Sequence, residues 1–254
     1  MYGTKVPHRE GPCKWPTKDV QDGMNHANLE QALSLERFGR YLAWAAGDRA
    51  RAINLYGLNT RLSESLYTPL QTLEVALRNR IHTVLTAANG EDWYSEAAGL
   101  LLNARQFEQV TEAIEELTKA GKPVTAGAVV ASLTFSFWTT MFNKDYEILW
   151  QQTLHKISDT AAPSGLKRKD FSKRLTPVRI LRNRIAHHEP ILSWNLPKHH
   201  RHIMELIEWL SPPAQHWCRT HDRFPQVYPN EGIVLGQGQL ANVSNSSPVR
   251  EVPQ

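Results

Sequence analysis

Apolar residues recur at spacings of three and four along most of the chain, which is the period of an amphipathic helix. The longest such stripe lies at 62–84 and covers about six helical turns. Pro69 lies inside it and predicts either a kink or the proper start of the helix, because proline has no backbone N–H. Asn59 or Thr60 could cap this helix at its start, and Asn89-Gly90 predicts its end.

Shorter apolar patterns predict further helices on both sides of this stripe. A first helix is expected over 33–44, and a second over 50–58 that Gly57 ends. After the stripe, helices are expected at 105–117, 124–133, 135–142, 146–155, from the basic stretch to about 188, and at 202–210, with Ser211-Pro212-Pro213 closing the last. Because no run of alternating β-branched residues is long enough for a sheet, the sequence predicts an all-α fold.

The two ends of the chain differ in composition from its centre. Residues 1–27 hold proline, glycine, histidine and scattered charges without periodicity, and residues 226–254 are rich in glycine, proline, serine and asparagine. Segments of this kind cannot bury enough apolar surface to offset the entropy of ordering them. We therefore expect flexible ends, held locally at most by Trp15 or Tyr228, around one helical domain at 28–225.

Length and composition narrow the class of protein without identifying it. The chain has 254 residues, 41% of them hydrophobic and 21% charged, as in ordinary globular proteins. No apolar run approaches the roughly 20 residues of a membrane span, and residues 1–15 lack the pattern of a secretion signal. Cys13 and Cys218 cannot form a disulfide framework, so the expected location is the reducing cytoplasm, away from membranes.

The net charge of +4 is mild, but its excess is concentrated at 166–188. Asp170 is the one acidic residue before Glu189 in this stretch, against eight basic residues: Lys167, Arg168, Lys169, Lys173, Arg174, Arg179, Arg182 and Arg184. Such a stretch would attract a polyanion. The alternative is a helix face that is simply solvated.

Five residues occur twice in the chain. Residues 77–81 and 181–185 both read Leu-Arg-Asn-Arg-Ile, and the second copy continues into His187 and His188. At about 100° per residue, the apolar residues of the second copy define a buried face, Asn183 and His187 point away from it, and His188 falls nearer the core. Arg182 lies on the flank, with a side chain long enough to reach toward His187. Taken alone, this arginine and histidine could be ordinary surface residues.

The spacing of Arg182, Asn183 and His187 resembles the R-x4-6-H motif of the HEPN superfamily. Further residues extend this resemblance over roughly residues 30 to 210: Glu36-Arg37-Phe38, Tyr41-Leu42, Leu55-Tyr56, Asn59, Glu74, Arg78-Asn79, Trp93-Tyr94, 133–138 and 181–191. With them, the chain more closely resembles the Abi-like proteins of the Abi_2 type, which are linked to bacterial abortive infection. Ser136 departs from this pattern, in which glycine is expected.

The resemblance implies a HEPN-like helical bundle with additional helices and a metal-independent endoribonuclease that acts as a phage-defence toxin. His187 would be the base or acid, Arg182 would hold the phosphate and Asn183 would orient either group. HEPN nucleases commonly pair two such sets, so a homodimer with a composite cleft is expected. The basic residues expected to bind RNA are Lys167, Arg168, Lys169, Lys173, Arg174, Arg179 and Arg184, and those expected to support the site are Glu74, Arg78, Asn79 and His188.

This reading requires no metal and no cofactor, and it allows for a neutralising RNA or protein partner. The alternative is a non-catalytic module that binds RNA or protein through the same basic helix. His199, His200 and His202 could suggest a metal site, but no C-x-x-C or H-E-x-x-H pattern supports one. The aromatic residues at 135, 137, 138 and 150 could stack on bases, although their helical spacing favours the core.

Overall fold

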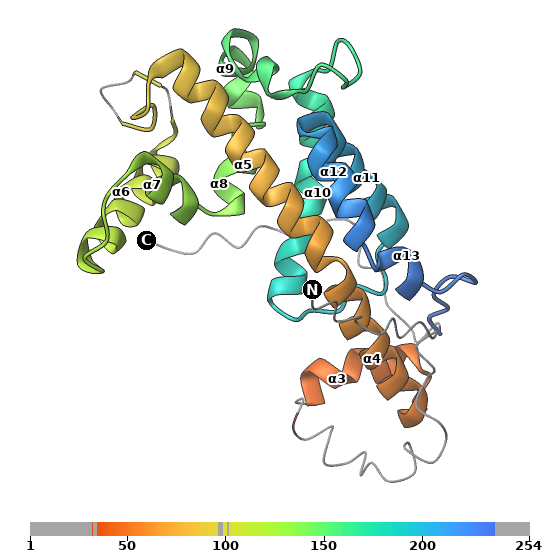
Figure 1. Cartoon of the computed structure of the whole chain (residues 1–254). Coiled ribbons are helices and arrows are strands. Elements are labelled where there is room, and N and C mark those ends of the chain that lie inside the picture. The colour runs from red at the N-terminus through yellow and green to blue at the C-terminus, as the bar shows by residue number, and fades with distance from the viewer. Residues whose placement is uncertain (1–31, 33–34, 96–98, 101, 237–254) are drawn as a thin grey trace, which may run out of the picture. The chain divides into compact units, whose positions relative to one another are not determined.

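A computed structural model describes residues 32, 35–95, 99–100 and 102–236 (Figure 1). Helices dominate these residues and none of them forms a strand, which confirms the all-α class. The chain divides into two compact units, residues 1–56 with 235–254 and residues 57–234. The expected flexible segment at 1–27 lies outside the described residues, as does most of the segment at 226–254.

The first unit contains α3 (Leu35–Trp44) and the beginning of α4 (Arg49–Ser65). The Tyr41 ring packs edge-on against Trp44 and Tyr56, at centroid distances of 5.6 and 5.4 Å. The Gly236 N–H donates to the Trp44 carbonyl over 2.8 Å, and a Cβ at position 236 would lie 2.7 Å from the same oxygen. A glycine is therefore needed where residue 236 bonds to the end of α3.

The predicted end of a helix at Gly57 is wrong, because α4 runs through this residue to Ser65. A single glycine costs a helix only about 1 kcal/mol, which neighbouring turns can supply. Asn59 is not a cap either: it is buried within α4, and its Oδ1 accepts the Ile191 N–H over 2.8 Å. The break between helices falls instead at Leu66.

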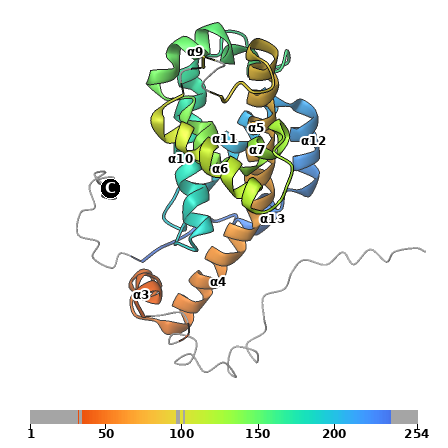
Figure 2. The ribbon, with the colours of Figure 1, turned by 90° about the vertical axis from the view of Figure 1, so that its left-hand side faces the viewer.

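The second unit is organised around α5 (Tyr67–Asn89), which packs against α11 (Leu196–Leu210) and α12 (Pro212–His221) (Figures 1 and 2). Pro69 marks the start of α5, as the sequence allows, and Gly90 ends it with φ of 87°. The predicted apolar stripe forms its buried face: Pro69, Leu70, Leu73, Leu77, Ile81, Val84 and Leu85.

The last long helices of this unit begin next to side chains that cap them. α11 begins at Leu196, earlier than predicted, because Asn195 Oδ1 accepts the Lys198 N–H over 3.1 Å. Ser211-Pro212-Pro213 follows the end of α11 at Leu210, as predicted, and also starts α12: Ser211 Oγ accepts the Ala214 N–H, and proline suits a first helical turn. The short α13 (Phe224–Val227) follows, and the Tyr228 ring packs on Phe224.

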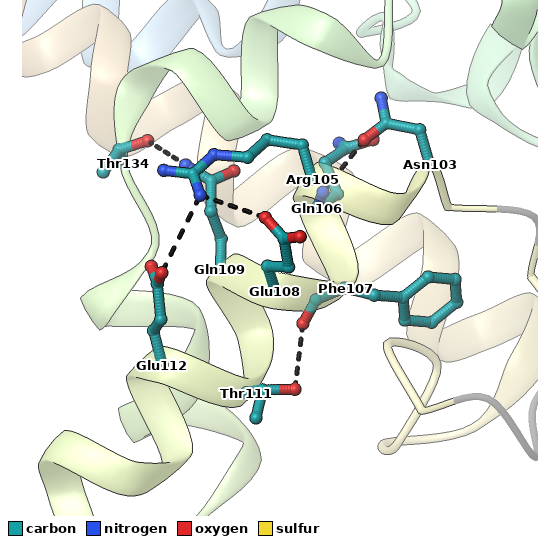
Figure 3. Close-up of polar contacts among 9 residues, drawn as sticks. All are labelled: Asn103, Arg105, Gln106, Phe107, Glu108, Gln109, Thr111, Glu112 and Thr134. Carbon is teal, nitrogen blue, oxygen red and sulfur yellow. Dashed lines mark hydrogen bonds and ion pairs between the residues drawn. The ribbon is translucent and has the colours of Figure 1, made fainter. Parts of the chain in front are cut away.

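The middle of the chain forms α6 (Ala104–Lys119), α7 (Ala126–Ser132), α8 (Phe135–Thr140) and α9 (Glu147–Gln152), with 3-10 turns at Lys144–Tyr146 and Leu154–Ile157. Asn103 caps α6 by accepting the Gln106 N–H, and Gln109 of α6 donates to Thr134, the cap of α8 (Figure 3). The aromatic residues at 135, 137, 138 and 150 are buried, which confirms the prediction of a core role.

Candidate functional site

The candidate site lies at the end of α10 (Arg168–Ala186). This helix ends two residues earlier than predicted, because His188 adopts a left-handed conformation with φ of 56°. The Glu189 N–H then donates to the Arg184 carbonyl over 2.8 Å, and the His188 N–H donates to the Ile185 carbonyl over 3.0 Å. These two bonds are the usual way to satisfy the last carbonyls of a helix.

This helix end exposes both histidines. His187 follows the last turn, with its N–H donating to the Asn183 carbonyl over 2.9 Å, and its side chain is exposed as predicted. The expectation that His188 lies nearer the core is wrong, because its left-handed backbone turns the chain away from the path of the helix at this residue. Within the described part of the chain, neither imidazole has a hydrogen-bond partner, so both are open to a ligand.

The loop after the histidines is fixed from two sides. Arg184 donates to the Pro190 carbonyl over 3.0 Å and pairs with Glu189 over 3.1 Å. Its guanidinium also lies over the Trp194 ring at 5.6 Å. From the other side, the buried Asn59 of α4 holds the Ile191 N–H. These contacts set where His187 and His188 can lie.

The Arg182 side chain extends from α10 toward α5. Its Nη2 lies 3.3 Å from Glu74 Oε2, and the two side chains are 38% and 27% exposed. Together with Arg78 they line an open pocket of about 350 Å³ between the two helices. Arg78 donates to its neighbour Asn79 over 3.4 Å and has no ion pair among the described residues. The pocket is therefore cationic, with one carboxylate against two guanidinium groups.

The two copies of Leu-Arg-Asn-Arg-Ile have equivalent roles in the fold. Their leucines, Leu77 and Leu181, are fully buried, while Arg78 and Arg182 line the same pocket. The second arginine of each copy holds a loop: Arg80 donates to the Ile157 carbonyl over 2.9 Å, as Arg184 does to Pro190. The repeat thus brings two arginines together from segments about a hundred residues apart.

Other expected site residues lie elsewhere. Neither Asn183 nor His187 lines the pocket of Arg182. Asn79 lines a separate pocket of about 470 Å³ with Trp217 of α12. His188 lines a third pocket, of about 570 Å³, with Arg223. One chain therefore joins Glu74, Arg78 and Arg182, and leaves the histidine of the motif outside that group.

The basic residues expected to bind RNA fall into two groups. Arg168 pairs with Glu147 over 2.7 Å, and Arg174 pairs with Glu205 over 2.8 Å while lying 4.4 Å from the centre of the Trp209 ring. With Arg184, these arginines already hold parts of the fold together. Within the described residues no ion pair engages the side chains of the remaining basic residues of this set: Lys167, Lys169, Lys173 and Arg179.

The histidines at 199–202 do not converge. His199 Nδ1 lies 2.6 Å from the Asn195 carbonyl, and His200 Nε2 lies 2.6 Å from Asp222 Oδ2. The pKa of His202 is lowered, first by burial and then by Arg174 nearby. Among the described residues no group of three or more His, Cys, Asp and Glu side chains is placed to hold a metal ion.

One residue of the site was missed by the sequence analysis. Tyr67 begins α5, is 63% exposed and lines both the pocket of Arg182 and the pocket of His188. The apolar stripe at 62–84 does not include it, since its neighbour Leu66 occupies this place in the stripe. An aromatic residue outside the buried stripe was the available signal.

The fold and the site define an all-α protein with a cationic pocket between two helices that carry the same five-residue repeat. A family model described as Abi-like protein matches residues 45–195, more than half of the chain, and the protein belongs to this family. The family supports a role in abortive infection. No curated protein and no solved structure matches significantly. In the described part of the chain, no helix has the length and apolarity to cross a membrane.

Proposed function

We propose that this Abi-like protein is a metal-independent endoribonuclease of HEPN type, which acts as a toxin in phage defence. The observation that carries the proposal is the convergence of Arg78 and Arg182 on one open pocket, next to the helix end that exposes His187. Arginine is always charged and grips phosphate oxygens with two parallel N–H groups. Histidine is the side chain best suited to move protons near neutral pH.

The proposed reaction uses the ribose itself as nucleophile. A neutral His187 imidazole takes the proton of the 2′-OH, and the 2′-oxygen attacks phosphorus as the bond from phosphorus to the 5′-oxygen breaks. A protonated imidazole gives its proton to that leaving oxygen. Arg182 stabilises the charge that builds on the phosphate. The products are a 2′,3′-cyclic phosphate and a 5′-OH, and DNA, which lacks the 2′-OH, resists cleavage.

The geometry of Arg182 and His187 favours a site composed of two copies of the chain. They are five residues apart, which is about 140° around a helix, and His187 does not line the pocket of Arg182. A second copy facing the end of α10 would bring a further histidine to the arginine pocket and supply both a base and an acid. A homodimer is therefore part of the proposal.

The separation of His187 from the pocket of Arg182 also supports a second candidate function, a module that binds RNA without cleaving it. In this case the arginine pocket and the free lysines of α10 hold phosphates, and His187 is a surface residue. Both candidates predict salt-dependent RNA binding. They differ in whether the RNA backbone is broken.

The deciding experiment compares wild-type protein with His187→Ala on single-stranded RNA in EDTA. We expect the wild type to cleave and His187→Ala to lose at least a hundredfold in rate, since general acid–base catalysis contributes about 10²–10⁴-fold. His216→Ala is the matched control, because His216 is an exposed histidine on α12. The fold should tolerate both changes, which melting curves check. RNA binding by a dimeric wild type without any cleavage would reject the enzyme in favour of the module.

A further inference from the structure

Tyr67 is a large aromatic side chain that the fold leaves in solvent. It is 63% exposed, and in the described part of the chain its ring contacts no other aromatic ring and its hydroxyl has no hydrogen-bond partner. A tyrosine that serves the core is buried and pairs its hydroxyl. The face of this ring is therefore available to a ligand.

The backbone under Tyr67 is well anchored. Leu66, which precedes it, and Leu70, one turn further on, are almost fully buried. Pro69 is also buried and restricts the first turn of α5. The side chain thus projects from a rigid helix start instead of a loop.

The Tyr67 ring lines two pockets. One of them holds Arg78 and Arg182 with Glu74, and the other holds His188 and the ion pair of Arg223 with Glu64, over 3.0 Å. Both pockets also share Ile185 and Ala186, the last turn of α10 before His187. The tyrosine therefore lies beside the histidine-bearing helix end and next to the two arginines of the cationic pocket.

This arrangement fits a single strand of nucleic acid better than a peptide. Every base has a flat face that stacks on an aromatic ring, and every nucleotide adds a phosphate that an arginine can hold. Arg78, with no carboxylate partner among the described residues, supplies a charge that an apolar protein interface would have to desolvate. The polar residues Thr60, Ser63 and Glu64 in the pocket of His188 suit the hydroxyl groups of a ribose as well.

We propose that Tyr67 is a stacking platform for one base of single-stranded RNA and positions the adjoining phosphate at Arg78 and Arg182. This inference rests on the proposed function, because it takes RNA as the ligand. It assigns Tyr67 to substrate binding and gives it no part in proton transfer. The stacked base would set the register of the strand relative to His187.

The test measures binding of a fluorescent oligouridine of about a dozen nucleotides by anisotropy, with all variants in the His187→Ala background so that no RNA is cut. We expect Tyr67→Ala to weaken binding between about 5- and 150-fold, the range that loss of one stacked base gives. Tyr67→Phe keeps the ring and should bind within about twofold of the parent protein. Trp217→Ala, the control, removes an aromatic that is 53% exposed in a different pocket and should bind like the parent.

A second measurement replaces single nucleotides of the RNA by abasic ones. One abasic position should weaken binding to the parent protein, and the same position should cost Tyr67→Ala nothing further. Three results would overturn the stacking proposal: equal losses of binding for Tyr67→Ala and Trp217→Ala, weak binding by Tyr67→Phe, or no RNA binding by the parent protein. If the wild type does not cleave RNA but the variants show this binding pattern, the proposed nuclease activity is rejected and the stacking proposal is retained. If it cleaves and Tyr67→Ala binds normally, the stacking fails alone.

Discussion

At the scale of single residues, the site depends on how Glu74 holds Arg182. The carboxylate contacts one nitrogen of the guanidinium over 3.3 Å and leaves its other N–H groups free for a phosphate. The same contact fixes which way the arginine points from α10. Glu74 therefore orients the Arg182 side chain, and its part in supporting the proposed site stays a prediction.

Replacing Glu74 by glutamine should lower RNA cleavage between about tenfold and a hundredfold, since a misplaced phosphate ligand is costly at the transition state. The expected change is in kcat more than in KM, because Arg182 keeps its charge. Steady-state kinetics on a defined RNA measure both. Glu108→Gln is the control: this carboxylate forms an exposed ion pair with Arg105 on α6 (Figure 3). A Glu74→Gln enzyme with wild-type kinetics would remove Glu74 from the site.

The lowered pKa of His82, which follows the first copy of the repeat, leads to a prediction of how stability changes with pH. Its Nδ1 accepts the Trp93 Nε1–H over 2.9 Å, and burial lowers its pKa, with Glu91 opposing in part. Between this lowered pKa and the unfolded value of about 6.5, the unfolded chain binds more protons. Stability should therefore fall as the pH decreases below about 6.5. His202, whose pKa burial also lowers, acts in the same direction.

Melting temperatures at about pH 7.5 and about pH 5.5 check this effect. His82→Gln removes the titrating group, so the difference between the two melting temperatures should shrink relative to wild type. His216→Ala, an exposed histidine, should keep the wild-type difference. An unchanged difference in His82→Gln would show that protonation of this residue is not coupled to folding.

At the scale of helices, periodicity predicted which segments are helical and capping decided where they end. The stripe at 62–84 predicted the buried face of α5 correctly, because apolar residues at spacings of three and four lie on one face of a helix. The boundaries predicted near Gly57, at the start of α11 and at His188 were wrong, because each depends on contacts or backbone angles that spacing does not contain. The bond from Asn59 to Ile191 joins residues 132 positions apart and has no local signature.

The same limit applies to the candidate site. The sequence of residues 182–187 was enough to identify the R-x4-6-H motif, and helical geometry predicted the exposure of His187. The meeting of Arg78 with Arg182 required the packing of α5 and α10, which a five-residue repeat alone does not specify. Arg168, Arg174 and Arg184 could not be separated from the free basic residues, because their acidic or carbonyl partners lie on other segments.

The start of α6 offers a prediction about stability. Gln106 is 1% exposed, donates to the Phe137 carbonyl over 3.1 Å and accepts the Tyr146 hydroxyl proton. The Tyr146 oxygen in turn accepts the Asn103 N–H over 2.9 Å. Replacing Gln106 by leucine removes the hydrogen bonds to the Phe137 carbonyl and from the Tyr146 hydroxyl at a buried place, and should cost about 2–5 kcal/mol of unfolding free energy.

Urea denaturation measures this cost. Gln109→Leu is the matched control, because Gln109 lies on the same helix and makes one longer bond, of 3.4 Å, to Thr134 (Figure 3). It should change stability by less than about 1 kcal/mol. Equal costs for the two variants would mean that the buried network does not stabilise the attachment of α6.

At the scale of the whole molecule, RNA binding should depend on the free charges of α10. Lys169 and Lys173 are exposed and unpaired within the described residues, and Lys173 lies about 14 Å along the helix from Arg182. Each lysine that neutralises a phosphate of a single strand adds about 0.7 to the salt dependence of binding. Lys169→Ala with Lys173→Ala should therefore reduce the slope of log affinity against log salt by about 1.4.

The control for this experiment removes the same charge elsewhere. Lys119 is the last residue of α6 and pairs with Glu115 over 3.2 Å, and Lys122 follows the helix. Alanine at both positions should leave the slope unchanged. If both double variants lower the slope equally, the protein binds RNA through its overall charge and α10 has no special part.

The most direct test of the account is the chemistry of the RNA ends that the dimeric protein makes in EDTA. The account predicts fragments that end in a 2′,3′-cyclic phosphate and begin with a 5′-OH, none from a strand carrying 2′-deoxyribose at the cleaved position, and none from His187→Ala. Fragments with a 3′-OH and a 5′-phosphate, or the same fragments from the alanine variant, would contradict it.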